Sequence, residues 1–274
     1  ALQLAPSLAG IVALAMILVA GSANLDFVVR AAHIPAPGET VLGREFRTFP
    51  GGKGANQAIA CARAGGCRTE RLLALGDDSC ATPIDESRKA AGVRMHGVRF
   101  RDEPTGTAFI CVSDDAENAI TVAPGANSRL RASDLPPLDG FTHLLLQLEI
   151  PIETVIAYAR AARTQGVQVV LNAAPARALP PELLSLVDVL VVNSGELAVI
   201  SGHEGSVEHC LERIDVPCVV VTLGERGCCA RAGGEIIMQG AFAVMPVDTT
   251  AAGDAFCGVL VAGLSQGLHL TDAL

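Results

Sequence analysis

A run of small residues followed by a carboxylate, Ala251 to Asp254, is the part of the sequence best suited to chemistry. It lies between two apolar segments: Ala241 to Met245 predicts a strand, and Ala255 to Leu264 predicts a helix. Because a helix N-terminus has unpaired N–H groups and a partial positive charge, it binds phosphate. Asp254 beside it could accept a hydroxyl proton while those amides stabilise a phosphoryl group in transfer. The alternative is that Asp254 only caps the helix.

The longer string from Asp248 to Phe256, D-T-T-A-A-G-D-A-F, resembles the signature of the PfkB (ribokinase-like) carbohydrate kinase family. The resemblance implies that Asp254 is the catalytic base and that Ala252 and Gly253 form the anion hole. A second glycine-rich stretch, G-G-K-G-A-N-Q from Gly51 to Gln57, resembles the substrate motif of the same family. It precedes a predicted helix from Ala58 to Ala64, and its glycines allow a ligand to approach the backbone closely.

Polar residues that directly follow predicted strands are further candidates for contacts with a sugar. Asn24 and Asp26 come after the apolar strand Met16 to Ala20, and ligands of open α/β sheets bind beyond the carboxyl ends of strands. Such residues either bind hydroxyls or form an Asx turn, and the family opening G-S-x-N-x-D favours the sugar contact. Glu149 follows the predicted strand Leu144 to Leu148 and either faces the cleft or caps a helix. The substrate-binding set implied by the resemblance is Asn24, Asp26, Gly52, Lys53, Asn56, Glu149 and Asp254.

Two later strand ends resemble the nucleotide site of the family. The strand Val187 to Val192 precedes an N-x-x-E motif, Asn193 to Glu196, which otherwise reads as a helix cap with a Glu in the first turn. The strand Cys218 to Thr222 leads into a loop of the T-L-G-x-x-G type. The resemblance assigns ATP binding to Asn193, Thr222, Leu223, Gly224, Glu225, Arg226, Gly227 and Gly253.

The resemblance also implies two metal ions. Glu196 would help to organise Mg²⁺ with the ATP phosphates, and Asp248 and Thr250 match the first half of a monovalent-cation site for K⁺. The chain ends at Leu274, 20 residues after Asp254, and family members continue further. We therefore expect a truncated adenine pocket and an incomplete cation site. Sugar should then bind better than ATP, and activity should rise little with potassium.

The alternation of predicted strands and helices favours an α/β fold with a doubly wound, mainly parallel sheet and helices on both faces. We expect a single domain over residues 1–274. Two stretches rich in turns and short strands, residues 27–49 and 94–122, predict a small β lid. In the family such a lid covers the sugar and often mediates dimers, so the resemblance implies a homodimer.

Composition narrows the functional classes. Half of the residues are hydrophobic and the net charge is −9, with no cluster of Lys and Arg, which disfavours nucleic-acid binding. Nine cysteines, an odd number without a C-x-x-C pair, indicate core residues in a reducing compartment. The apolar run Leu8 to Ala20 is too short to span a membrane and lacks a basic flank, so we expect a cytoplasmic protein.

These patterns together predict a kinase that uses ATP and Mg²⁺ to convert D-ribose into ribose 5-phosphate. A related ribosyl or nucleoside substrate is an alternative within the same family. A truncated, non-catalytic sugar-binding protein is the alternative from another class, because the sugar motifs are complete while the nucleotide side is not.

Overall fold

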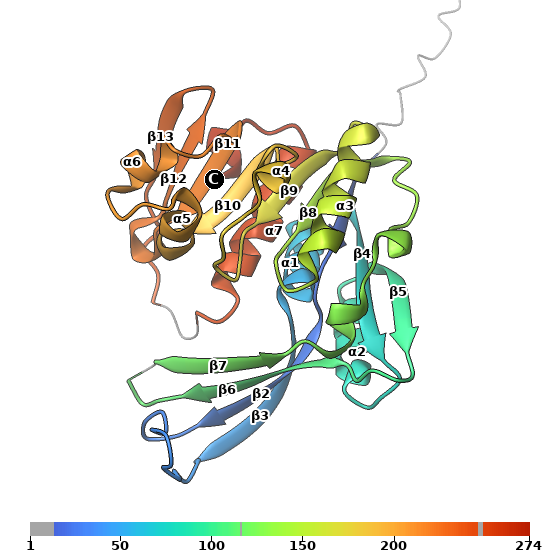
Figure 1. Cartoon of the computed structure of the whole chain (residues 1–274), viewed down its shortest axis with the longest axis vertical. Helices are drawn as coiled ribbons and strands as arrows, with labels where there is room; N and C mark the ends of the chain where they lie inside the picture. Colours follow the sequence, from blue (N-terminus) through green and yellow to red (C-terminus); the bar gives the residue numbers. More distant parts are fainter. Residues whose placement is uncertain (1–13, 116, 246–248) are drawn as a thin grey trace, which may run out of the picture.

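The computed structural model describes residues 14–115, 117–245 and 249–274. A nine-stranded sheet with the order β13-β12-β11-β10-β9-β8-β1-β4-β5 forms its centre (Figure 1). From β11 to β5 every neighbouring pair is parallel, and β12 and β13 add antiparallel strands at one edge. The strands are β1 (Ala15–Ala20), β4 (Cys67–Gly76), β5 (Arg94–Phe100), β8 (Phe141–Leu146), β9 (Gln168–Asn172), β10 (Val189–Asn193), β11 (Cys218–Thr222), β12 (Cys228–Ala232) and β13 (Glu235–Gln239).

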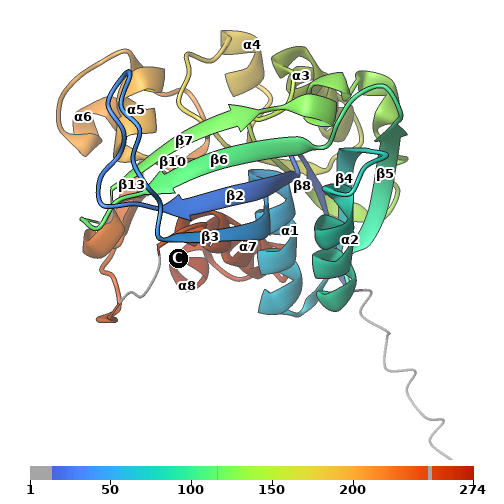
Figure 2. The ribbon, with the colours of Figure 1, turned by 90° about the horizontal axis from the view of Figure 1, so that it is seen from below.

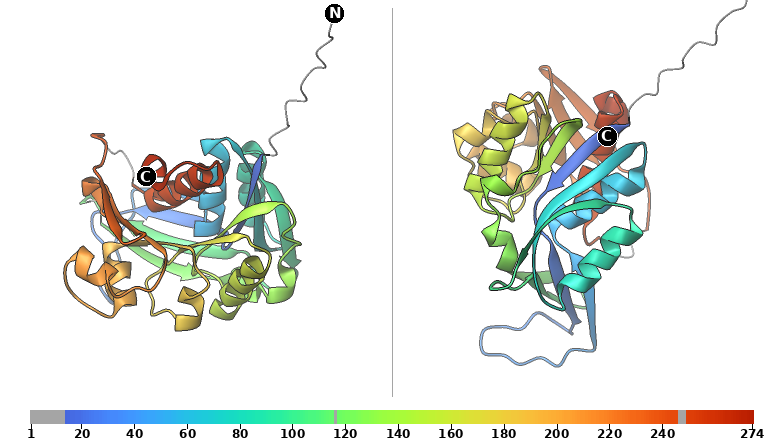
Figure 3. Two further views of the ribbon diagram at one scale, coloured as in Figure 1. Left: turned by 90° about the horizontal axis from the view of Figure 1, so that it is seen from above. Right: turned by 90° about the vertical axis from the view of Figure 1, so that its right-hand side faces the viewer.

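Helices cover both faces of this sheet (Figures 2 and 3), which confirms the predicted doubly wound fold. Strand β1 shows why: Ile17 and Val19 pack into the core on one face, and Leu18 and Ala20 pack into the core on the other. One face carries α1 (Lys53–Ala64), α2 (Ala81–Ala90), α7 (Ala252–Ser265) and α8 (Leu270–Ala273). The other carries α3 (Ile152–Thr164), α4 (Pro181–Leu184), α5 (Ser194–Ser201) and α6 (Val207–Leu211).

A second, four-stranded sheet with the order β3-β2-β6-β7 projects beneath the large one (Figure 1). One boundary of the predicted lid was wrong. Residues 94–100 form β5, which pairs with β4 at the edge of the large sheet. An edge strand and a lid strand are both half-exposed and show the same alternation of side chains, so sequence alone could not separate them. The strands of the small sheet are β2 (Asn24–Arg30), β3 (Glu45–Gly51), β6 (Gly106–Val112) and β7 (Asn118–Ala123).

Two further sequence predictions need correction. The helix expected from Ala58 begins at Lys53, so Asn56 lies in its first turn. The strand expected over Ala241 to Met245 is absent from this segment, where Phe242 and Met245 are 81% and 95% exposed. An apolar run forms a strand only if a neighbouring strand pairs with it. Residues 241–245 follow β13, the edge strand of the sheet, and do not pair with it. No helix in the described ranges is long and apolar enough to span a bilayer.

The strand order reverses between β1 and β8, because β4 and β5 follow β1 on one side and β9 to β11 follow β8 on the other. Open α/β sheets bind ligands in the crevice at such a reversal. The segments that leave β1 and β8 there carry Asn24, Asp26 and Glu149. The fold therefore gathers the predicted sugar contacts at one place.

Helices α1 and α7 pack closely on each other beside this crevice. A Cβ atom at Gly258 of α7 would lie 2.4 Å from the Ala60 Cβ and 2.7 Å from the Gln57 carbonyl oxygen of α1. Any larger residue at position 258 would push the two helices apart, so glycine is required for this close packing. It brings the first two turns of α1, with Asn56 and Gln57, beside the first turn of α7, with Asp254.

Candidate active site

The first turn of α7 is the predicted anion-binding site. Its N-cap, Ala251, has a φ of 58°, a left-handed conformation that costs a residue with a side chain about 1–2 kcal/mol. The first i→i−4 bond of the helix runs from the Ala255 amide to the Ala251 carbonyl at 2.8 Å. The amides of Gly253 and Asp254 precede that bond, so helix geometry leaves them available to a ligand. The Ala252 amide already donates to the Thr249 carbonyl at 3.1 Å, so of the two amides predicted for the anion hole only that of Gly253 is available in this structure.

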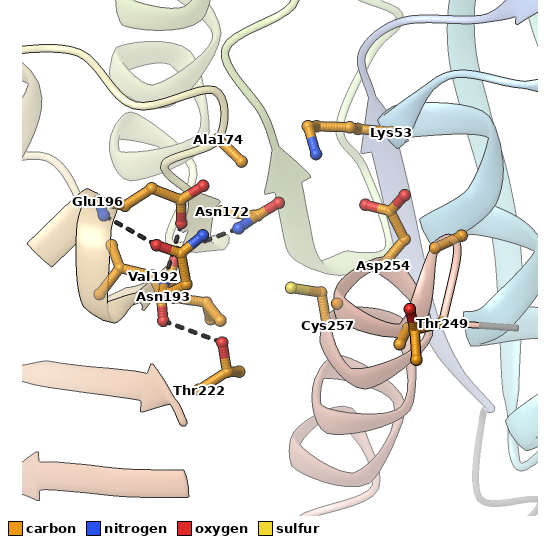
Figure 4. A pocket seen from close by; sticks show the side chains of 14 residues that line it. Lys53, Asn172, Ala174, Val192, Asn193, Glu196, Thr222, Thr249, Asp254 and Cys257 are labelled. Carbon is orange, nitrogen blue, oxygen red and sulfur yellow. Dashed lines mark hydrogen bonds between the residues drawn. The ribbon is translucent and has the colours of Figure 1, made fainter. Parts of the chain in front are cut away.

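Asp254 lies at the base of a pocket and is 7% exposed (Figure 4). Its Oδ2 accepts a hydrogen bond from Asn56 Nδ2 at 3.1 Å, and its Oδ1 accepts one from Gln57 Nε2 at 2.9 Å. Neither bond comes from its own helix, so Asp254 is more than a helix cap. Its side chain is held by α1 between the predicted sugar motif and the anion-binding turn.

Asp26 lies close to two other carboxylates. Burial, followed by the charges of Glu149 and Asp254, raises the pKa of Asp26 to about 7. Its Oδ1 is buried and has no hydrogen-bond partner within the described ranges. A buried acceptor of this kind is suited to a ligand hydroxyl, because leaving it unpaired is costly.

Glu149 holds the start of α1. Its Oε2 accepts hydrogen bonds from the Ser22 hydroxyl and from the Lys53 amide, the latter at 3.0 Å. This is the capping role that the sequence left open as an alternative. A substrate contact through the second carboxylate oxygen stays a prediction.

Asn24 is 2% exposed, and its Oδ1 accepts a hydrogen bond from Asn127 Nδ2 at 2.8 Å. Asn127 also binds the Ala23 amide at 3.0 Å, so this residue, which sequence reasoning missed, fixes the chain at the end of β1. Gly52 packs against the same segment: with a φ of 89°, it would place a Cβ only 2.8 Å from the Ala23 Cα. The sugar contacts of Asn24 and Gly52 stay predictions.

The pocket has a volume of about 190 Å³ and opens between the start of α7 and the carboxyl ends of β9, β10 and β11. Lys53 extends over it from α1 and faces Asp254, while Glu196 lies on the opposite wall (Figure 4). Burial raises the pKa of the Cys257 thiol on its floor, so that thiol stays neutral. Its lining comprises Lys53, Asn172, Ala174, Val191, Val192, Asn193, Glu196, Thr222, Thr249, Ala251, Ala252, Gly253, Asp254 and Cys257.

Asn193 and Glu196 form a reciprocal helix cap on the pocket wall. The Glu196 amide donates to Asn193 Oδ1 and the Asn193 amide donates to Glu196 Oε2, both at 2.8 Å. Burial raises the pKa of Glu196, and the bond from the Asn193 amide partly offsets that rise. The capping alternative is therefore present, and it also fixes one carboxylate in the pocket.

The rest of the predicted nucleotide and cation residues divide into two groups. Thr222 lines the pocket, whereas Leu223 to Gly227 form a turn closed by a 2.8 Å bond from the Leu223 amide to the Gly227 carbonyl. Within that turn, the short helix η3 (Gly224–Arg226) leaves Glu225 and Arg226 exposed. Thr250 is exposed and is not among the residues that line this pocket, and Asp248 lies outside the described residues. ATP and cation contacts from this group stay predictions.

Comparison with known proteins identifies the family of this chain. The model of the pfkB family carbohydrate kinases matches residues 14–274. The chain belongs to the PfkB family of carbohydrate kinases. This PfkB kinase is 37% identical to a ribokinase of Haemophilus influenzae over 93% of its own length and 87% of the relative.

Solved structures of PfkB kinases show the same fold. A ribokinase crystal structure from Thermotoga maritima superposes with a TM-score of 0.85 at 33% identity, over 95% of this chain and 89% of that one. An Arabidopsis thaliana ribokinase complexed with ribose and ATP gives a TM-score of 0.83 at 30% identity, over 94% and 88% of the two chains. As a member of this family, the chain is an ATP-dependent carbohydrate kinase.

Proposed function

We propose that this chain is a ribokinase, which transfers the γ-phosphoryl group of ATP to the 5-hydroxyl of D-ribose. The observation that carries the proposal is the position of Asp254, held by Asn56 on the sugar side and opening into the anion-binding pocket on the other. The similarity to ribokinases, one of them complexed with ribose and ATP, supports ribose as the sugar.

The sugar lies in the crevice where β1 and β8 part, under the small sheet, which acts as a lid. Asp26 and Asn56 bind its hydroxyls directly, because both present polar atoms beside Asp254. Asn24 and Glu149 support the walls through Asn127 and the Lys53 amide. Gly52 lets the backbone approach, and Lys53 supplies a positive charge above the pocket.

ATP lies with its phosphates at the start of α7. The Gly253 amide, which helix geometry leaves available, stabilises negative charge on the transferring group, and Thr222 and Asn193 line the other side of the phosphate site. Asp254 accepts the hydroxyl proton. Because the transition state is loose, that proton need not leave before the phosphoryl group begins to move.

Mg²⁺ accompanies ATP in such kinases and neutralises charge on the phosphates. The described ranges hold no cluster of three His, Cys, Asp or Glu side chains able to bind a metal ion. Glu196 is one of two carboxylates that line the pocket, the other being Asp254, and this number fits Mg²⁺ because that ion is usually held by one or two carboxylates, water and the phosphates. We also propose K⁺ as an activator near Thr250 and Asp248.

Measuring ADP release over a panel of ribose, deoxyribose, other pentoses and nucleosides tests the proposal. We expect ribose to give the highest kcat/KM. A nucleoside that exceeds ribose would transfer the assignment to a nucleoside kinase. If calorimetry detects ribose binding and no sugar releases ADP, the chain is a sugar-binding protein instead.

We further propose a homodimer formed through the lid, in the cytoplasm. The lid exposes an aromatic stack: the Phe27 ring lies 6.2 Å from Phe46 and 5.4 Å from Phe109, and the outer two residues are 63% and 55% exposed. Such an apolar surface favours a partner. All nine cysteines lie in described parts of the chain and are free thiols, which suits a reducing compartment.

The Phe109→Glu variant should be monomeric in light scattering, because it buries a charge in the proposed interface. Ile236, an apolar residue on β13 that is 47% exposed, gives the matched control, and Ile236→Glu should remain dimeric. A dimer that survives Phe109→Glu, or a wild type that is already monomeric, would refute the interface.

A further inference from the structure

Three buried side-chain amides connect Asp254 to the carboxyl ends of the central strands. Gln57 of α1 and Gln147, which follows β8, are fully buried, and Asn172 at the end of β9 is 8% exposed. Gln57 Nε2 donates to Asp254 Oδ1 and to Asn172 Oδ1, both at 2.9 Å. Gln57 Oε1 accepts a hydrogen bond from Gln147 Nε2 at 2.6 Å. Asn172 Nδ2 in turn donates to the Val191 carbonyl at 3.2 Å.

The direction of these bonds is fixed by the carboxylate. An ionised carboxylate can only accept hydrogen bonds, so Gln57 must turn its NH₂ group toward Asp254. Its carbonyl oxygen then faces Gln147, which must donate. Turning the Gln57 amide around would place its oxygen against Asp254 Oδ1 and Asn172 Oδ1, where nothing can donate to it.

Gln147 donates to Gln57 although its own amide oxygen is left without a hydrogen bond from the described residues. Its Oε1 is buried and has no hydrogen-bond partner within the described ranges. A Cβ at Gly21 would lie only 1.9 Å from that oxygen, so the amide fits here because residue 21 is a glycine. Gln147 thus keeps its donor on Gln57 although its acceptor is unsatisfied, which a purely space-filling amide would have no reason to do.

We propose that Gln57, held by Gln147 and Asn172, is a positioning residue that anchors Oδ1 of Asp254 and directs Oδ2 to the substrate. Oδ2 is the oxygen beside Asn56, on the proposed sugar side. Gln57 is fully buried and cannot touch a ligand, so it acts only through Asp254.

In the reaction, which rests on the proposed function, the O–H bond of the sugar hydroxyl breaks and its proton moves to Oδ2. The hydroxyl oxygen forms the new O–P bond. The bond from the γ-phosphorus to the bridging oxygen breaks, and its electron pair leaves with ADP. Oδ1 keeps its bond from Gln57 throughout, so the carboxylate does not rotate while it takes the proton.

The test replaces Gln57 with methionine, which has a similar volume and no donor, in the wild type and in an Asp254→Asn background. In the wild type we expect kcat to fall at least ~10-fold, because a small misplacement of a reacting group is costly, with ribose Kd nearly unchanged in calorimetry. In the Asp254→Asn background the residual rate should not fall further, because the residue on which Gln57 acts is already inactive.

Gln147→Met supplies a second variant. It should lower kcat less than Gln57→Met, and the double variant should match Gln57→Met alone, since Gln147 acts through Gln57. Should Gln57→Met fail to fold, the same comparison is made with Gln147→Met in the two backgrounds. A normal kcat in these variants, or an equal loss in the Asp254→Asn background, overturns the positioning role. If Asp254→Asn alone keeps normal turnover, the proposed function itself has failed, which is a separate result.

Discussion

Asp254→Asn is expected to lower turnover at least ~100-fold, the lower end of what general-base removal costs. The substitution keeps the size of the side chain and removes its ability to take the hydroxyl proton. The Asp254 side chain is buried and hydrogen-bonded to Asn56 and Gln57, so a water molecule cannot easily enter and take the proton in its place. Steady-state ADP release measures the loss, and calorimetry should find ribose binding largely retained.

A matched control separates catalysis from helix capping. Glu153 is another carboxylate in the first turn of a helix, α3, and it is exposed. Glu153→Gln removes a favourable interaction with a helix dipole, as Asp254→Asn does, but leaves the site intact. Its turnover should equal that of the wild type. If Asp254→Asn is nearly as active as this control, Asp254 has no part in the mechanism.

Asp26→Ala is expected to weaken ribose binding by about 1.5–3 kcal/mol, the range for a hydrogen bond to a charged group. That energy corresponds to a rise in Kd of about 10- to 150-fold. The reason is the unpartnered, buried Oδ1, which a sugar hydroxyl would satisfy. Calorimetry at pH 8 measures the effect, and unchanged affinity would show that Asp26 is wrongly assigned.

The same carboxylate should destabilise the protein without ligand. Because the pKa of Asp26 is raised from 3.8 to about 7, the folded state holds its proton over that interval while the unfolded state releases it. The free energy of unfolding therefore falls as pH rises from about 4 to about 7, and it stays lower above that range. Asp26→Asn should raise the Tm at pH 8 and change it little at pH 4. A lower Tm at pH 8 would contradict the crowding of Asp26, Glu149 and Asp254.

The predicted site residues that the fold brings together belong to short local motifs. Asp254 and Asn56 belong to two strings almost 200 positions apart, and their side chains are 3.1 Å apart in the structure. The doubly wound sheet was predictable because its strands, such as Cys218–Thr222, are continuous apolar runs between helical segments.

What the sequence missed depends on tertiary contacts. Gln57 adjoins Asn56 in the motif, but its importance lies in bonds to Asp254 and Gln147, which no local pattern reveals. Asn127 lies beyond the end of β7 in a short helix, η1 (Gly125–Arg129), and its position depends on the packing of that helix against β4 and β6. The edge strand β5 and the exposed segment at Phe242 were misread because periodicity does not show which partner, if any, covers a strand.

The central claim is that this chain moves the γ-phosphoryl group of ATP onto ribose at Asp254. Phosphorus NMR of the protein with ATP, Mg²⁺ and ribose tests it most directly, because the product is identified rather than inferred from ADP. We predict that ribose 5-phosphate and ADP appear in equal amounts and that Asp254→Asn abolishes both signals on the same timescale. ADP accompanied by inorganic phosphate, a different sugar phosphate, or equal product from Asp254→Asn would contradict the claim.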